Sequence, residues 1–281
     1  MSSTPVTIDA HQHFWRYSPE EYGWIGEGMD AIARDFLPGD LARELNKVGF
    51  DASIAVQARQ SDDETDWLLD LARGTDRIAG VVGWADLRSP SLPERLDQLS
   101  GEVALKGFRH VIQDELDPDF MLQPEFVEGV KQVLAAGYSY DILVFAKQAD
   151  RVSRLIERCG EGRLILDHIA KPDIAGGAGF EAWHSAIRDI ATHPDCYCKV
   201  SGMVTEAEWS GWNPDQFLPY LEAVFEAFGS DRIMFGSDWP VCLLAADYSA
   251  VHGIVADFVG SQGTAAAKAV FGENARKAYS L

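Results

Sequence analysis

The sequence predicts an α/β protein with a (β/α)8 barrel, also called a TIM barrel, in one domain over residues 1–281. Eight short apolar runs alternate along the chain with segments of helical pattern. The runs are almost continuously apolar, which is typical of parallel strands that are covered by helices. Eight such units in 281 residues agree with the ~250 residues that this fold usually takes. A doubly wound open sheet is the alternative, but no Gly-x-Gly-x-x-Gly motif follows an early strand.

The predicted strands are these apolar runs, and the first of them ends in two histidines. Strands are expected at residues 6–15, 52–58, 78–87, 103–112, 140–145, 164–169, 196–203 and 232–238. In the first strand, residues two apart point to the same side, so His11 and His13 project together. The aromatic segment that follows, residues 14–25, is interpreted either as a cover for a pocket or as a packed surface loop.

The predicted helices carry recognisable start and stop signals. Pro38 stands near the start of the first helix and Gly49 closes it. The helix that begins at Asp62 opens with acidic residues, which suit the positive end of a helix dipole. Helices are expected at residues 38–48, 62–75, 92–99, 124–136, 149–159, 180–191, 214–228, 249–259 and 265–279.

Charge and composition narrow the classes of partner. The formal net charge is −20, which argues against nucleic acid or an anionic membrane as the main partner. The chain has no apolar run of ~18 residues and no basic-then-apolar pattern at its N-terminus. We therefore expect a cytoplasmic enzyme, monomer or homo-oligomer, that acts on a small molecule.

The four cysteines show no disulfide framework, and free thiols are expected at Cys159, Cys196, Cys198 and Cys242. Cys196 and Cys198 could share a strand face and mimic half of a zinc site. No second cysteine pair lies nearby in the sequence, which argues against a structural zinc there.

Polar side chains gather where the predicted strands end, which is where barrel enzymes carry their active sites. These candidates are His11, His13, Gln57, Arg59, Lys106, Arg109, His110, Asp167, His168, Lys199, Ser201 and Asp238. Three imidazoles and one carboxylate, from His11, His13, His168 and Asp238, make a ligand set for one divalent metal. The same residues could work without metal: Asp238 would take a proton from water, and the imidazoles and Arg109 would donate hydrogen bonds to a carbonyl oxygen.

The motifs around these residues resemble the amidohydrolase superfamily, and within it the amidohydrolase-2 branch. They are Asp-Ala-His-Gln-His-Phe-Trp at the first strand, Lys-Gly-Phe-Arg-His at the fourth, Leu-Asp-His-Ile-Ala-Lys-Pro at the sixth, Lys-Val-Ser-Gly at the seventh and Phe-Gly-Ser-Asp-Trp-Pro at the eighth. The resemblance covers nearly the whole chain. It is greatest to sugar-lactone hydrolases of the L-fuconolactonase and L-rhamnonolactonase kind.

The resemblance implies that Asp238 activates the attacking water. His168 is the second catalytic candidate. The resemblance also implies that His11, His13, His168 and Asp238 hold one divalent metal, with zinc the expected ion, although members of this branch also work without metal. A two-metal centre is not expected, because the fifth strand has neither lysine nor histidine and the seventh carries Lys199 in place of histidine.

The leading hypothesis is therefore hydrolysis of a sugar-acid lactone to the open aldonate. Arg109 and His110 would fix substrate oxygens, and Trp24 and Trp239 would offer flat faces for a sugar ring. Further substrate-binding candidates are Gln57, Arg59 and Lys199. Two alternatives remain: a metal-dependent decarboxylase of the same branch, and a lactonase for a carboxylated intermediate of aromatic degradation. A non-enzymatic sugar-binding protein fits the set of base and ligands poorly.

Overall fold

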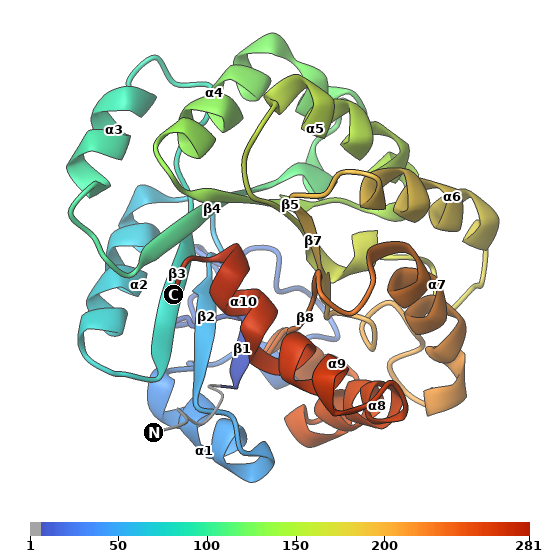
Figure 1. Cartoon of the computed structure of the whole chain (residues 1–281). Helices are drawn as coiled ribbons and strands as arrows, with labels where there is room; N and C mark the ends of the chain where they lie inside the picture. The colour runs from blue at the N-terminus through green and yellow to red at the C-terminus, as the bar shows by residue number, and fades with distance from the viewer. Residues whose placement is uncertain (1–6) are drawn as a thin grey trace.

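The computed structural model describes residues 7–281 and contains the predicted (β/α)8 barrel (Figure 1). All strands are parallel to their neighbours and follow one another around the sheet in sequence order. The strands are β1 (Ile8–Gln12), β2 (Ala52–Val56), β3 (Ile78–Gly83), β4 (Leu105–Val111), β5 (Ser139–Leu143), β6 (Leu164–Leu166), β7 (Cys196–Val200) and β8 (Ile233–Phe235). Val6, which begins the first predicted strand, lies outside the described residues.

Helices surround the strands and agree closely with the predicted segments. The α-helices are α1 (Pro38–Val48), α2 (Asp62–Arg73), α3 (Leu92–Leu99), α4 (Pro124–Ala135), α5 (Val152–Cys159), α6 (Phe180–Ala191), α7 (Leu218–Phe228), α8 (Tyr248–Ser261), α9 (Thr264–Lys268) and α10 (Asn274–Ala278). Pro38 is the first residue of α1, and Gly49 ends it in the left-handed conformation, as the sequence predicts. The predicted helix over 265–279 is divided by a π-helical turn, η8 (Ala269–Glu273).

The barrel is closed between its first and last strands, at the end of β1 and just beyond the end of β8. The Asp238 amide donates to the His11 carbonyl at 2.8 Å, and the His13 amide donates to the Trp239 carbonyl at 2.7 Å. The buried Asp9 carboxylate reinforces this seam by accepting hydrogen bonds from the amide and the hydroxyl of Ser237. Closure therefore sets Asp238 directly beside the two histidines of β1.

The interior of the barrel combines an apolar floor with buried charge. The floor is formed by strand residues such as Ile8, Ile54 and Met234 together with Ala275 and Tyr279 from the C-terminal segment. Figure 1 shows α10, which contains Ala275, lying across this end of the strands. The opposite end, where the strands finish, is left to the polar side chains and the loops.

β6 is shorter than the strand predicted over residues 164–169. It ends at Leu166, and residues 167–170 form the short helix η5 (Asp167–Ala170). Four consecutive residues, from His168 to Lys171, have φ between 46° and 58°. This left-handed conformation is uncommon for residues with a Cβ and cannot be read from an apolar run. The prediction at this boundary was wrong because hydrophobicity reports burial and not the backbone conformation.

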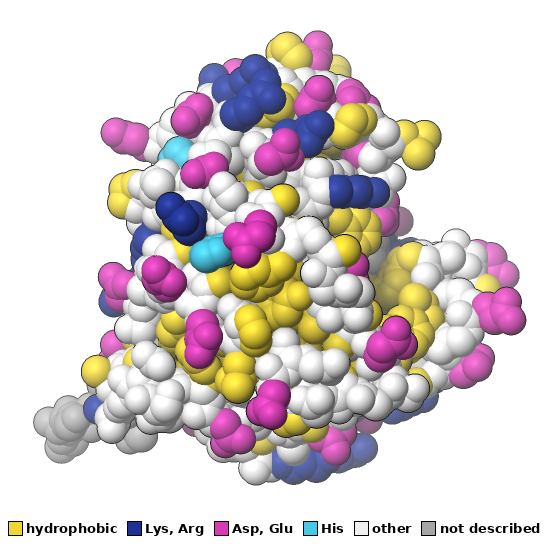
Figure 2. Space-filling model, turned by 90° about the vertical axis from the view of Figure 1, so that its right-hand side faces the viewer, with side chains coloured by type: hydrophobic (Ala, Val, Ile, Leu, Met, Phe, Trp, Pro, Cys, Tyr) yellow, Lys and Arg dark blue, Asp and Glu magenta, His cyan; other side chains and the backbone are white. Residues whose placement is uncertain are grey.

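The surface reflects the charge of the chain. Acidic side chains are spread over the face shown in Figure 2, around an apolar area near its middle. Among the described residues, no helix is both long enough and apolar enough to cross a membrane. The four cysteines are free, as predicted, and all four are buried.

Candidate active site

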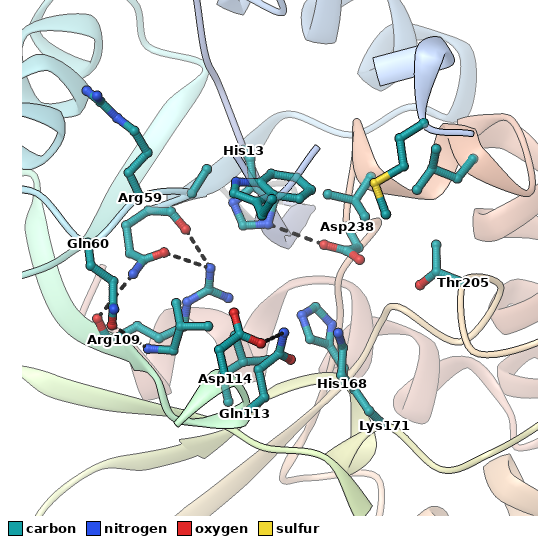
Figure 3. Close-up of a pocket in the computed structure, with 18 of the residues that line it drawn as sticks. His13, Arg59, Gln60, Arg109, Gln113, Asp114, His168, Lys171, Thr205 and Asp238 are labelled. Atoms are coloured by element: carbon teal, nitrogen blue, oxygen red, sulfur yellow. Dashed lines mark hydrogen bonds and ion pairs between the residues drawn. The ribbon is translucent and has the colours of Figure 1, made fainter. Parts of the chain in front are cut away.

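A cavity of about 800 Å³ opens where the strands end, and several of the predicted site residues line it (Figure 3). Predicted residues that line it are His13, Trp24, Gln57, Arg59, Arg109, His168 and Asp238. Glu20, Glu21 and Trp24 come from the aromatic segment after β1. Of the two interpretations of that segment, the structure therefore favours a wall of the cavity.

His11 and His13 converge from the end of β1, with ring centroids 5.0 Å apart. Nδ1 of His13 lies 2.8 Å from the Val56 carbonyl oxygen, which only accepts, so this nitrogen carries a hydrogen. In the neutral ring, Nε2 of His13 is then an acceptor, and it faces Oδ1 of Asp238 at 3.3 Å. Two acceptors at this distance require a proton or a cation between them.

His168 enters the site from the left-handed turn that follows β6. Its Nδ1 lies 2.8 Å from the Ser201 hydroxyl, and its ring centroid lies 4.3 Å from that of His11. Gly202 makes room for this ring: a Cβ there would lie 2.7 Å from Nδ1 of His168. Burial lowers the pKa of His168 to about 4, so its imidazole is neutral near pH 7.

Asp238 follows β8 and also has a left-handed backbone, with φ of 56°. Burial acts to raise the pKa of this carboxyl group, but the imidazoles of His168, His13 and His11 lower it below its usual value. Asp238 is therefore ionised near pH 7. His168 and Asp238 are neighbours in space, and both have the uncommon left-handed backbone conformation. Such unusual conformations cluster at functional sites.

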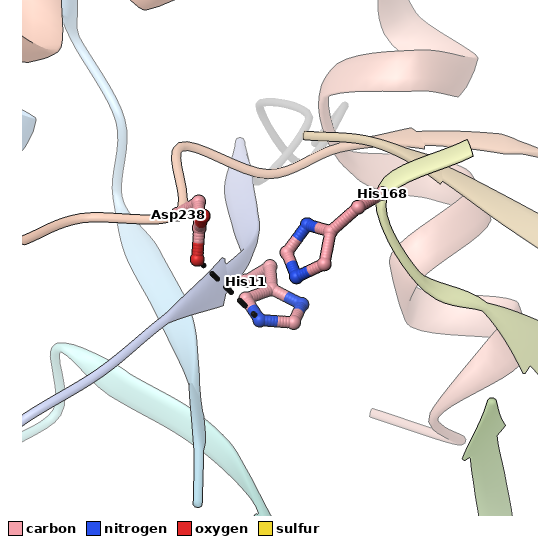
Figure 4. A group of neighbouring side chains, drawn as sticks. All are labelled: His11, His168 and Asp238. Atoms are coloured by element: carbon pink, nitrogen blue, oxygen red, sulfur yellow. Dashed lines mark ion pairs between the residues drawn. The ribbon is translucent and has the colours of Figure 1, made fainter. Parts of the chain in front are cut away.

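The donor atoms fit a divalent cation. One ligand atom from each of His11, His168 and Asp238 lies within 4.8 Å of the others (Figure 4). Burial also lowers the pKa of His11 well below its usual value, so both imidazoles are in the neutral form that binds metals. His13 adjoins this group through Asp238. Nitrogen and carboxylate ligands in these numbers suit zinc, with positions left for water or substrate.

Arg109 reaches from β4 into the same group. Its Nη1 lies 3.1 Å from Nε2 of His11 and 3.0 Å from Oδ2 of Asp167. Its Nη2 donates to the carbonyl and to the side-chain oxygen of Gln57, at 2.5 and 3.0 Å. Only the Nε hydrogen has no partner. The contact with substrate oxygens that the sequence suggested for Arg109 would therefore require the guanidinium group to give up contacts within the protein.

Lys199 lies beneath the cavity and does not line it. Its Nζ is 2.5 Å from Oδ2 of Asp141, 2.9 Å from Oδ1 of Asp167 and 3.2 Å from Nδ1 of His11. Burial would raise the pKa of Asp167, but Lys199, His11 and Arg109 together lower it well below the usual value. Direct contact of Lys199 with substrate is not compatible with this position, because the side chain is fully buried.

Two other predicted substrate-binding residues also lie outside the cavity. His110 follows Arg109 on β4 and therefore points the other way, where it stacks on Phe120 and pairs with Glu115. Trp239 is 2% exposed and packs edge-on against Phe36. Trp24, by contrast, is 40% exposed and lines the cavity.

Several polar residues of the cavity did not figure among the sequence candidates. They are Glu20, Glu21, Gln60, Ser61, Gln113, Asp114, Lys171, Thr205 and Glu206. Most of them lie in a loop that follows the end of a strand. That position could have marked them as candidates in the sequence. Asp141 was missed because it lies in the middle of a strand, where only its pairing with Lys199 marks it as part of the network below the site.

Comparison with known proteins adds to this geometry. A sequence model of the amidohydrolase family matches residues 8–281. The chain is 44% identical to an L-fucono-1,5-lactonase from Burkholderia multivorans, over 98% of this chain and 96% of the relative. It is 38% identical to an L-fucono-1,5-lactonase from Burkholderia ambifaria, over 86% of this chain and 82% of the relative.

A solved structure is similar over the same extent. It is an amidohydrolase from Burkholderia multivorans with bound zinc, 44% identical, with a TM-score of 0.95 over 98% of this chain and 99% of that chain. The matching fold, the histidines and aspartate at the strand ends, and the family match agree. The chain belongs to the amidohydrolase family.

Proposed function

We propose that the protein hydrolyses a sugar-acid lactone, of the L-fuconolactone or L-rhamnonolactone type, to the open aldonate. The observation that carries the proposal is the Asp238 carboxylate, which lies among three imidazoles at the base of a cavity. The two relatives named as L-fucono-1,5-lactonases support the choice of substrate class.

Asp238 is the proposed base. A water molecule beside its carboxylate would lose a proton to it while the water oxygen attacks the lactone carbonyl. His13 is placed to share that proton, because its Nε2 faces Oδ1 of Asp238 at 3.3 Å. The proton then passes to the ring oxygen as the ester bond breaks. This gives one carboxylate, one hydroxyl group and one released proton for each ring opened.

In the metal-free site, His168 is the proposed donor to the oxyanion; a bound ion would take the same ring nitrogen in its place. When the Ser201 hydroxyl donates to Nδ1 of His168, the hydrogen of the neutral ring is on Nε2. Such a fixed donor in a buried site stabilises the charge that develops on the carbonyl oxygen. Arg109 adds a fixed positive charge, and the free face of Trp24 offers a stacking surface for the sugar ring.

The charges in the cavity favour a neutral substrate. Each cation of its lining is paired with a carboxylate: Arg59 with Glu21 at 2.7 Å, Lys171 with Glu206 at 3.5 Å, and Arg109 with Asp167. A substrate with several carboxylates would need some of these cations to be released. This pairing supports a neutral polyhydroxylated lactone over a carboxylated intermediate of aromatic degradation.

The proposed cofactor is one divalent ion, zinc, held by His11, His168 and Asp238 with His13 beside them. When bound, such an ion polarises a carbonyl oxygen or lowers the pKa of water. A chelation experiment tests whether catalysis needs this ion. A rate that is unchanged in fully demetallated protein would remove the metal from the mechanism, and a rate restored only by added zinc would place it there.

The direct test is a pH-indicator assay of acid release from a panel of aldonolactones. The panel includes L-fucono-, L-rhamnono-, L-galactono- and D-arabinono-lactones, each with a reaction without enzyme as the blank. We expect acid release above the blank from at least one L-configured lactone. Failure with every lactone, together with carbon dioxide release from an unsaturated carboxylic acid, would replace the proposal with the decarboxylase.

A further inference from the structure

We propose that Arg109 competes with a metal ion for the Nε2 lone pair of His11, and that this arginine sets the metal affinity of the site. The inference goes beyond the proposed reaction, because it concerns binding of the ion in the absence of any substrate. It rests on the position of one guanidinium nitrogen, Nη1, 3.1 Å from the nitrogen that His11 turns toward Asp238.

The anchors of Arg109 show that this position is built into the fold. Asp167, directly after β6, holds Nη1, and the carbonyl and side-chain oxygens of Gln57, directly after β2, hold Nη2. Four of the five hydrogens of the guanidinium group thus have partners, one of which is His11. The side chain is 4% exposed, so solvent does not offer it alternative partners.

The surroundings of His11 determine which ring nitrogen carries the hydrogen. Both ring nitrogens lie near a donor, because Nε2 is 3.1 Å from Nη1 of Arg109 and Nδ1 is 3.2 Å from Nζ of Lys199. The difference is in the acceptors: Nδ1 has a carboxylate oxygen of Asp167 at 3.4 Å, whereas the carboxylate that faces Nε2 is 3.9 Å away. Nδ1 therefore carries the hydrogen, and Nε2 accepts from Arg109. A metal shared with Asp238 would use the same Nε2, since this is the nitrogen that faces Asp238 at 3.9 Å. The guanidinium and the ion cannot use one lone pair together.

Electrostatic repulsion between Arg109 and the ion also weakens metal binding. A divalent ion bound between His11 and Asp238 would lie close to the guanidinium, in a buried site where repulsion between cations is strong. Arg109 must therefore withdraw before His11 can bind the ion, and its contacts with Asp167 and Gln57 oppose that movement. The wild-type protein is expected to bind zinc more weakly than its three ligands would allow.

Zinc titration in competition with a chromophoric chelator tests the proposal without any substrate. The proteins are wild type, Arg109→Met and a matched control, Arg59→Met, each first stripped of metal. Arg59 lines the same cavity and carries the same charge, but it pairs with Glu21 and not with the histidines. We expect the zinc Kd of Arg109→Met to be at least about ten-fold lower than that of the wild type. The Kd of Arg59→Met should differ from that of the wild type by less than about three-fold.

Equal or weaker zinc binding by a folded Arg109→Met protein would overturn the proposal. So would equal tightening by Arg59→Met, because the effect would then be one of net charge alone. If Arg109→Met does not fold, Gln57→Ala removes one anchor of the guanidinium and should tighten zinc binding to a smaller degree.

A spectroscopic measurement on the wild type is independent of these variants. Long-range ¹⁵N–¹H spectra of the ring of His11, assigned with a His11→Asn protein, distinguish the two neutral tautomers. We expect hydrogen on Nδ1 in metal-free protein. Hydrogen on Nε2 would contradict the contact with Arg109, whatever the outcome of the lactone assays.

Discussion

The ammonium group of Lys199 lies 2.5 Å from Oδ2 of Asp141, and both side chains are completely buried inside the barrel. The same ammonium is 2.9 Å from Asp167, so one cation serves two carboxylates. Asp141 also accepts a hydrogen bond from the Tyr279 hydroxyl at 2.7 Å. This network joins the floor of the barrel to Asp167, which in turn contacts His11 and Arg109 of the site.

Lys199→Met should destabilise the protein, since it leaves two carboxylates in the barrel without their shared cation. Removing one partner of a buried ion pair costs about 3–5 kcal/mol of unfolding free energy. Thermal or denaturant unfolding measures this loss. Lys131→Met, which removes an exposed lysine, is the control and should change stability by less than about 0.5 kcal/mol.

A double variant separates charge from packing. Adding Asp141→Asn to Lys199→Met removes the carboxylate that has lost its cation, since Asp167 still pairs with Arg109, so part of the lost stability should return. If the double variant is less stable than Lys199→Met alone, the network is not held together by charge in the way that the distances indicate.

Asp238→Asn should fold normally and lose lactone hydrolysis, because the amide has nearly the same shape but cannot accept the proton of water. Loss of a general base typically lowers the rate about 10²–10⁴-fold. The measurement is kcat/KM on the best lactone of the panel, with the melting temperature as the check on folding. Asp63→Asn, at an exposed carboxylate of α2, is the control. A variant at Asp238 that keeps most of its activity would exclude this residue as the base.

Gly202→Ala should impair catalysis through His168. The glycine has φ of 64°, and a Cβ would lie 2.7 Å from Nδ1 of that ring. The ring must then move, and a displacement of about 1 Å in an active site can cost roughly 100-fold in rate. Gly39→Ala is the matched control, because a Cβ there meets nothing within 4 Å. Wild-type kcat in Gly202→Ala would show that the position of His168 does not limit the reaction.

Glu64 should make stability depend on pH. This buried carboxyl group, in the first turn of α2, accepts hydrogen bonds from the amides of Ala58 and Arg59 and from the Tyr22 hydroxyl. Burial raises its pKa from 4.5 to about 7. Between these values the folded protein binds more protons than the unfolded chain. The contribution of Glu64 is thus complete below pH 4.5 and is lost as the pH rises through 7.

The measurement is the unfolding free energy of wild type and Glu64→Gln at pH 4.5 and at pH 7.5. The stability of the wild type relative to the variant should fall by about 3 kcal/mol between the two conditions, since one pKa unit corresponds to about 1.36 kcal/mol. A difference that is independent of pH would mean that the pKa of Glu64 is not raised in the folded protein.

The amino-acid sequence by itself determined the order of strands and helices and the rim at which the site lies. Apolar runs covered by helices predict parallel strands, and polar residues at the ends of such strands meet at one rim in a barrel. The two-residue period also placed His11 and His13 on one side of β1, and their rings do converge. These features depend on residues close together in the chain.

Only the tertiary structure decided which side chains enter the cavity. Arg109 points inward and His110 outward, but both stand in an apolar strand that is buried on both sides, so hydrophobicity does not distinguish the two faces. Trp239 is buried against Phe36, from another loop. The contact of Arg109 with His11 and the pairing of Lys199 with Asp141 join residues 98 and 58 positions apart. Such pairs form because a buried charge must find a partner, and the closed barrel determines which partner is within reach.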